Sequence, residues 1–149
     1  MYDVIIIGGG AAAMSSAIYT ARKKLSTLMI TDEIGGQTSW QPEINNYPGF
    51  LEKDGYILMQ NMRKQVTELG VEIKEIHDGV QEISFREEQG KEIFSIKDKS
   101  DVVYESRSVI VTSGKKPRKL GVPGEEEFSN KGVTYCATCD APLFGGKTV

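Results

Sequence analysis

The strongest constraint on the fold is a glycine-rich turn, residues 8–13, which follows a short apolar segment near the beginning of the chain. That segment, residues 2–7, is β-branched and ends at glycine, which predicts a buried strand. Residues 11–24 favour a helix because they are rich in alanine and have apolar residues at helical spacing. Residues 25–31 predict a second buried strand. A strand, a helix and a strand in so short a stretch predict a βαβ unit with parallel strands.

Gly8, Gly10 and Ala13 give the turn the pattern G-x-G-x-x-A. In dinucleotide-binding turns the first glycine permits the tight turn and the second lets the backbone approach a pyrophosphate. The third small residue lets the helix pack closely on the sheet. The helix also presents N–H groups and a partial positive charge to phosphates. A glycine turn that binds nothing is the alternative, but the strand–turn–helix context favours a dinucleotide site.

The acid expected to bind a ribose is less clearly marked. About 20 residues past such a turn an Asp or Glu normally holds a ribose hydroxyl. Thr31 occupies the end of the second predicted strand, and Asp32 and Glu33 follow it. Either acid could serve after a small shift of the loop, and a solvated acidic loop is an equal alternative.

The rest of the chain predicts further helical and strand segments. Residues 32–54 form a turn-rich loop of a length that is usually functional in a compact domain. Residues 54–69 predict a helix with one apolar stripe, which ends before Gly70. The remaining predicted strands are residues 71–76, 80–85, 93–96, 102–104 and 108–112. The expected fold class is α/β, with a Rossmann-like core of parallel strands and an inserted small antiparallel β-sheet.

Composition excludes several classes of protein. The chain has 18 Lys and Arg against 21 Asp and Glu, a net charge of −3, so it lacks the basic excess of a nucleic-acid binder. No apolar run approaches the roughly 20 residues that span a bilayer. The first strand begins almost at Met1, so no signal peptide is expected, and we expect a cytoplasmic protein.

Cys136 and Cys139 form a C-x-x-C pair. A zinc site within one chain is disfavoured because it needs four ligands and the chain offers two cysteines and one histidine. Two inert buried thiols are a second possibility. A redox-active dithiol is favoured, because this spacing permits a disulfide and often lowers a thiol pKa. Asp140 could transfer a proton to or from the thiol, or could cap a following helix.

Five motifs, in this order and spacing, resemble those of the low-molecular-weight thioredoxin reductases, which are class II pyridine nucleotide-disulfide oxidoreductases. They are V-I-I-I-G-G-G at residues 4–10, G-G-Q at 35–37, I-N-N-Y-P-G-F at 44–50, V-I-V-T-S-G at 109–114 and C-A-T-C-D at 136–140. Residues 132–136 and 142–144 are also similar to the flavoprotein component of alkyl hydroperoxide reductase. The Ala-Thr pair between the cysteines favours the thioredoxin reductase branch.

The resemblance implies that the dinucleotide is FAD. It places Gly8, Gly10 and Ala13 at the pyrophosphate and Asn46 near the flavin ring. It also implies contacts with FAD from Gly35, Gly36, Gln37, Ser113 and Gly114. Thr31 and Asp32 remain ribose candidates by their spacing from the glycine turn. Cys139 would be the thiol on the flavin side, Cys136 the thiol that exchanges with the substrate, and Asp140 the acid/base. No metal is implied.

The resemblance further implies an enzyme that passes electrons from NADPH through FAD to the Cys136–Cys139 disulfide and on to thioredoxin. A peroxiredoxin-type or small disulfide acceptor is one alternative. A non-catalytic FAD-binding or dimerisation module with idle cysteines is another. Family members are commonly homodimers, so self-association is expected.

Some features depart from the family pattern. Ser113 replaces a threonine, Ala141 stands where glycine is usual, and Trp40 lies in a segment that is usually rich in threonine. Family chains are also longer and carry an NADPH motif beyond the point where this chain ends. Residues 1–116 are therefore expected to be the N-terminal part of an FAD-binding domain, and 117–149 a linker and the start of an NADPH and redox-disulfide domain. Full turnover is not expected from the 149-residue chain alone.

Overall fold

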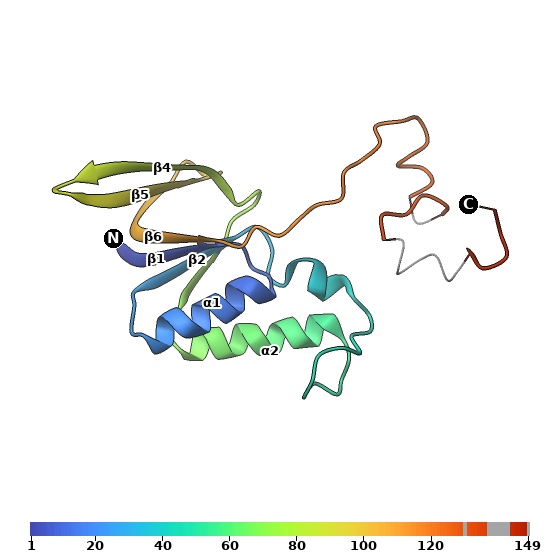
Figure 1. The fold of residues 1–149 in the computed structure, drawn as a ribbon, viewed down its shortest axis with the longest axis horizontal. Helices are drawn as coiled ribbons and strands as arrows, with labels where there is room; N and C mark the ends of the chain where they lie inside the picture. Colours follow the sequence, from blue (N-terminus) through green and yellow to red (C-terminus); the bar gives the residue numbers. More distant parts are fainter. Residues whose placement is uncertain (130, 137–143, 149) are drawn as a thin grey trace. The chain divides into compact units, whose positions relative to one another are not determined.

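The computed structural model describes residues 1–129, 131–136 and 144–148 (Figure 1). The chain divides into two compact units, Met1–Gly114 and Lys115–Val149. The predicted roles of the two parts of the chain stay predictions.

A single six-stranded sheet forms the first unit, in the order β3-β2-β1-β6-β5-β4. Its parallel part contains β1 (Tyr2–Ile7), β2 (Thr27–Thr31), β3 (Glu72–Glu75) and β6 (Val103–Val111). Its antiparallel part adds the hairpin of β4 (Val80–Glu88) and β5 (Lys91–Asp98). The predicted α/β class, with a parallel core and an antiparallel insertion, is confirmed.

The strand β6 differs from the prediction of two separate strands at 102–104 and 108–112. It is continuous and pairs antiparallel with β5 through Val103–Ser106 and parallel with β1 from Ser106 onward. The side chain of Ser106 is fully buried where the two pairings meet, and its hydroxyl donates to the Ser108 carbonyl at 2.9 Å. The antiparallel insertion is therefore an extension of the parallel sheet.

Two helices cover one face of the sheet (Figure 1). They are α1 (Ala11–Arg22) and α2 (Gly55–Glu68), and α2 begins where the Asp54 carboxylate accepts a hydrogen bond from the Ile57 N–H at 3.0 Å. The core on this face is apolar and buried: Val4, Ile6, Ala13, Met14, Ala17, Met29, Ile34, Met59, Val66 and Val71. This packing fixes the glycine turn at the beginning of α1 against the sheet.

The opposite face of the parallel strands is covered by the β4–β5 hairpin (Figure 1). Alternate strand residues point to this side, so Ile5, Ile7, Leu28 and Ile30 form a second core cluster with Ile96 of β5. Burial of β1 and β2 on both faces explains why their sequences are unbroken apolar runs rather than alternating ones.

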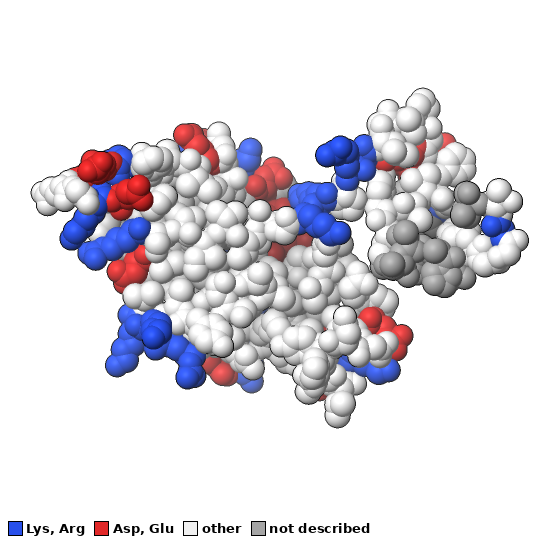
Figure 2. Space-filling view, in the orientation of Figure 1, with Lys and Arg blue, Asp and Glu red and all other residues white. Residues whose placement is uncertain are grey.

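The surface carries both signs of charge. Figure 2 shows Lys and Arg side chains interspersed with Asp and Glu on the visible face, without a large basic patch. Among the helices of the described residues, none is long and apolar enough to cross a membrane.

Candidate functional site

The carboxyl ends of β1, β2 and β6 meet at one edge of the sheet. The Gly8 N–H donates to the Ile30 carbonyl at 2.8 Å, which joins the end of β1 to the end of β2. Both the N–H and the hydroxyl of Thr112 donate to the Ile7 carbonyl at 2.8 Å, which joins β1 to the end of β6. In α/β proteins ligands bind at this edge, where the loops after the strands converge.

Gly8 and Gly9 are required by packing against the protein itself. Gly8 has φ of +124°, and a Cβ on it would lie 2.4 Å from the Thr112 carbonyl oxygen. A Cβ on Gly9 would lie 2.4 Å from both the Glu33 carbonyl oxygen and the Thr31 hydroxyl. Sequence reasoning singled out Gly8 but missed Gly9, whose constraint comes from a loop more than 20 residues away.

Gly10 is different because the protein leaves the space beside it open. A Cβ there would come no closer than 3.9 Å to any neighbour, the Gly35 carbonyl oxygen. Gly10 is also the N-cap of α1, whose first turn contains no acidic residue and no capping side chain. Ala13, one turn along, is fully buried in the core between α1 and the sheet. The turn therefore offers uncapped backbone N–H groups beside an open space.

The loop after β2 is hydrogen-bonded to the glycine turn. The Gly35 N–H donates to the Gly9 carbonyl at 2.8 Å. Gly35 has φ of +100° and precedes the short 3₁₀ helix η1 (Gly36–Trp40). The nearest atom to a Cβ on Gly36 would be the Gly10 Cα, at 3.8 Å. Gly10, Gly35 and Gly36 therefore lie together although two loops supply them.

Two more predicted residues line one pocket beside this turn. Gln37 and Asn46 border a pocket of about 450 Å³ together with Ala11, at the beginning of α1. The other lining residues include Tyr47 and Met62. The structure thus brings Gln37 and Asn46 to the helix end next to Gly10.

Thr31 and Asp32 each form side-chain hydrogen bonds with nearby backbone groups. The buried Thr31 hydroxyl donates to the Glu33 carbonyl at 2.8 Å and accepts from the Glu33 N–H at 3.2 Å. The Asp32 carboxylate accepts from the Asp78 N–H at 3.0 Å, and the His77 Nδ1 lies 3.8 Å from the same oxygen. The Thr31 side chain is thus engaged in the loop after β2, and one oxygen of the exposed Asp32 carboxylate joins that loop to the turn after β3, while the ribose contact expected of these residues stays a prediction.

Glu33 is placed differently from these two residues. Its carbonyl oxygen packs against Gly9, and its carboxylate accepts a hydrogen bond from the Trp40 indole N–H at 3.2 Å. Both side chains are exposed. The sequence offered Glu33 as an alternative acid but gave no signal for its pairing with Trp40, which depends on the turn made by η1.

Ser113 and Gly114 follow β6 and are both exposed. Gly114 has φ of +66°. The Thr112 hydrogen bonds to Ile7 place this turn beside the end of β1. The structure thus brings the predicted turn after β6 to the same edge as the glycine turn.

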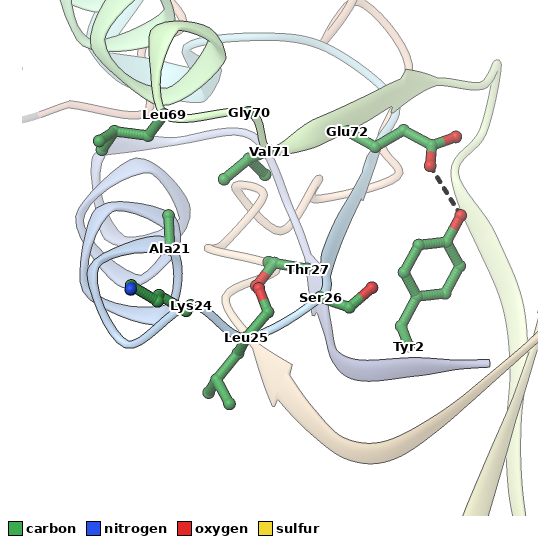
Figure 3. Close-up of a pocket in the computed structure, with 10 residues that line it drawn as sticks. All are labelled: Tyr2, Ala21, Lys24, Leu25, Ser26, Thr27, Leu69, Gly70, Val71 and Glu72. Carbon is green, nitrogen blue, oxygen red and sulfur yellow. Dashed lines mark hydrogen bonds between the residues drawn. The ribbon is translucent and has the colours of Figure 1, made fainter.

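A second pocket lies at the opposite edge of the sheet, at the amino ends of β1, β2 and β3 (Figure 3). It also measures about 450 Å³, and the Tyr2 hydroxyl at its border donates to the Glu72 carboxylate at 2.7 Å. Burial and this hydrogen bond raise the pKa of Tyr2 to about 12. None of the predicted site residues borders this pocket.

The second unit carries the cysteine site. Cys136 is half-buried and disulfide-bonded, and its N–H donates to the Thr134 hydroxyl at 3.3 Å. The predicted Cys139 and Asp140, with Ala141, lie outside the described residues. Within the described part of the chain, no group of three or more His, Cys, Asp and Glu residues could hold a metal ion.

Glu125 is a buried acid in this unit that sequence reasoning missed. It is only 4% exposed, and its two carboxylate oxygens accept hydrogen bonds from the Leu120 and Gly121 N–H groups at 2.7 and 2.6 Å. The Tyr135 hydroxyl donates to the same carboxylate. These bonds, the one from Tyr135 foremost, lower the pKa of Glu125, and the carboxylate in turn raises the pKa of Tyr135.

The chain is similar to known proteins over nearly its whole length. The chain is 42% identical over 153 residues to a thioredoxin reductase of Bacillus subtilis, a match that covers 99% of this chain and 45% of that protein. It is 37% identical to one component of an alkyl hydroperoxide reductase of Staphylococcus epidermidis, with 99% and 28% covered.

Solved structures show the same likeness. The crystal structure of Lactococcus lactis thioredoxin reductase matches with a TM-score of 0.76 and 40% identity, over 97% of this chain and 46% of that one. The chain thus spans less than half the length of these thioredoxin reductases. The family model described as pyridine nucleotide-disulphide oxidoreductase matches residues 2–148. The chain therefore belongs to the pyridine nucleotide-disulphide oxidoreductase family.

Proposed function

We propose that this chain provides the FAD-binding part and the redox disulfide of a thioredoxin reductase. In the proposed reaction, electrons from NADPH pass through FAD to the Cys136–Cys139 disulfide and then to thioredoxin. The observation that carries the proposal is the convergence of the glycine turn, the Gly35–Gly36 loop and the pocket of Gln37 and Asn46 at one edge of the sheet. The resemblance to thioredoxin reductases supports the choice of FAD.

The residues present fit a flavin dinucleotide. The open space beside Gly10 and the uncapped end of α1 suit a pyrophosphate, whose negative charge is favoured at a helix N-terminus. Gly8, by its tight turn, and Ala13, by its packing, hold the backbone in place for that contact. When bound, FAD supplies a two-electron carrier between a nicotinamide and a disulfide.

Further contacts follow from the loops at the same edge. Gly35, Gly36 and Gln37 would lie along the cofactor, Asn46 would approach the flavin ring, and Ser113 and Gly114 would contact it from β6. For the ribose we propose Glu33, whose backbone carbonyl lies beside Gly9 and whose side chain is exposed. Thr31 and Asp32 would act through the loop that they hold together.

In the dithiol step, two electrons and two protons convert the disulfide of Cys136 into two thiols. We assign to Cys139 the exchange with the flavin, to Cys136 the attack on the disulfide of the protein substrate, and to Asp140 the transfer of the proton. A homodimer in the cytoplasm is the proposed working state.

A peroxiredoxin-type disulfide is the second candidate for the acceptor. The 37% identity to a component of an alkyl hydroperoxide reductase favours it over a small-molecule disulfide. Rates with oxidised thioredoxin and with an oxidised peroxiredoxin would separate the two candidates, measured on a protein of the relatives' length that contains this chain. A higher kcat/KM with the peroxiredoxin would replace thioredoxin as the proposed substrate.

The visible absorption spectrum of the purified 149-residue chain tests the cofactor assignment. We expect a flavin band that stays with the protein through gel filtration after FAD has been added. A folded chain that carries no flavin band, while the chain extended to the relatives' length also carries none, would contradict the proposal.

A further inference from the structure

One acid in a run of three is buried, and the run lies shortly before the cysteine site. Glu126 and Glu127 are exposed, as a charge run on a surface normally is, whereas Glu125 is only 4% exposed. A carboxylate is removed from water only where hydrogen bonds replace its hydration. The hydrogen-bond donors that surround the Glu125 carboxylate therefore show which parts of the chain this buried side chain connects.

These partners come from both sides of Glu125 in the sequence. On one side are the N–H groups of Leu120 and Gly121, and on the other is the hydroxyl of Tyr135. The carboxylate thereby closes the segment from residue 120 to residue 135 into one hydrogen-bonded loop. Hydrogen bonds to an ionised acceptor are about twice as strong as those between neutral groups.

The loop ends at the redox cysteine. Tyr135 directly precedes Cys136, whose own N–H is bound by the Thr134 hydroxyl. Two residues before Tyr135, the Val133 N–H donates to the Phe128 carbonyl at 3.0 Å. The backbone that enters the disulfide is therefore held by hydrogen bonds at Val133, Tyr135 and Cys136, and the bond from Tyr135 ties it to Glu125, ten residues earlier in the sequence.

We propose that Glu125 and Tyr135 are positioning residues that hold the backbone of Cys136 in the conformation that closes its disulfide. This inference rests on the redox role proposed above for Cys136. A disulfide forms only within a narrow range of Cα and Cβ separations. A backbone already held in that range loses less conformational freedom when the disulfide closes, so the pair favours the oxidised form of the site.

The thiol–disulfide equilibrium of the 149-residue chain with glutathione tests the inference. In this reaction two glutathione thiols give two electrons and two protons to the disulfide of Cys136. The products are two protein thiols and glutathione disulfide. The protein is equilibrated at several glutathione ratios without oxygen and quenched with acid. Its free thiols are then labelled and counted by mass spectrometry.

Two variants remove the interaction and one matched variant preserves it. Tyr135→Phe deletes only the hydroxyl, and Glu125→Gln places an amide donor among the donors that now bind the carboxylate. Glu127→Gln makes the same chemical change at an exposed neighbour. We expect the equilibrium constant for oxidation to fall about tenfold in the first two, which is about 30 mV for a two-electron couple. Glu127→Gln should match the unmodified chain.

Equal constants in all four proteins would overturn the inference and leave the redox function standing. No measurable equilibrium in the unmodified chain would overturn both. Thermal unfolding is measured on oxidised and reduced samples, because a merely structural bond would lower the midpoint equally in both and leave the equilibrium constant unchanged. Should Glu125→Gln fail to fold, Tyr135→Phe decides the matter, since it removes one oxygen from a partly exposed side chain.

Discussion

At the scale of single residues, neighbouring glycines in the same turn have different reasons to be glycine. Gly9 faces the carbonyl of Glu33 and the hydroxyl of Thr31, whereas Gly10 faces open space. A missing side chain can therefore serve the fold at one position and a ligand at the next. The distinction can be tested, because a side chain at Gly9 should lower the stability of the fold and a side chain at Gly10 should weaken ligand binding.

Gly9→Ala should destabilise the chain, because its Cβ would lie 2.4 Å from two fixed atoms. Overpacking of this kind typically costs about 1–3 kcal/mol. Gly10→Asp should leave the unfolding temperature nearly unchanged and abolish FAD binding, since it places a negative charge where the pyrophosphate is proposed to lie. Thermal unfolding and a flavin titration on both variants check this. A Gly10→Asp chain that still binds FAD would contradict the assignment of the turn.

Glu33→Gln should weaken FAD binding about tenfold, because a ribose hydroxyl would lose its ionised acceptor, a bond worth about 1.5–3 kcal/mol. Asp32→Asn is the matched control, with the same change one residue away at a carboxylate that holds the loop. Isothermal titration with FAD compares the two. A larger loss of affinity in Asp32→Asn than in Glu33→Gln would return the ribose contact to Asp32.

At the scale of elements, the turn between β5 and β6 depends on one buried carboxylate. Asp98 is 1% exposed and accepts hydrogen bonds from the Ser100 N–H at 2.7 Å, the Val102 N–H at 3.0 Å and the Tyr104 hydroxyl at 3.0 Å. Burial acts to raise the pKa of Asp98, but these hydrogen bonds outweigh it and lower the pKa below the ordinary 3.8. The turn follows Ile96, the residue of β5 that belongs to the second core cluster, by two positions.

Because its folded pKa is lowered, Asp98 stabilises the fold above its unfolded pKa near 3.8, and this stabilisation is lost as the pH falls through the lower, folded value. Asp98→Asn should therefore unfold at a lower temperature than the unmodified chain at pH 7, and the gap should narrow on acidification to below pH 3.8. Thermal unfolding at a series of pH values measures this. A gap that is constant across the series would show that ionisation of Asp98 does not contribute.

Local patterns predicted the elements whose burial is simple. The strands β1 and β2 have unbroken apolar runs because both faces are covered, and α2 has Asp54 as its N-cap and ends before Gly70, as its apolar stripe and stop signal indicate. The sequence did not predict that β6 is one continuous strand, because Ser106 and Arg107 interrupt the apolar pattern where the strand changes its pairing from β5 to β1. The same holds for the candidate site. Gly8 and Gly10 could be predicted because their spacing in the sequence is that of a dinucleotide-binding turn. Glu125 and the Trp40–Glu33 pair depend on contacts across turns.

At the scale of the whole molecule, the two units differ in how they are stabilised. Both core clusters and all six strands belong to Met1–Gly114. In the described part of Lys115–Val149, the interactions include turns, the isolated bridge between Ser129 and Val133, the Lys119–Glu126 ion pair, the disulfide of Cys136 and the hydrogen bonds of Glu125. A unit with its own apolar core can fold independently.

A chain that ends at Gly114 should therefore keep its far-ultraviolet circular dichroism and a cooperative thermal transition close to that of the 149-residue chain. The physical reason is that no core residue is removed. Circular dichroism and calorimetry on the two chains provide the comparison. Loss of the cooperative transition would show that residues after Gly114 contribute to the stability of the sheet.

The position of Trp40 has an optical consequence. It is the only tryptophan of the 149-residue chain, so all indole fluorescence comes from this one side chain. Trp40 lies at the end of η1, and its indole N–H is hydrogen-bonded to the Glu33 carboxylate. Oxidised flavin absorbs in the range where indole emits. A flavin held at the neighbouring edge of the sheet would thus accept the excitation energy of Trp40, and the emission of the whole molecule would report, without any label, whether the dinucleotide is in place.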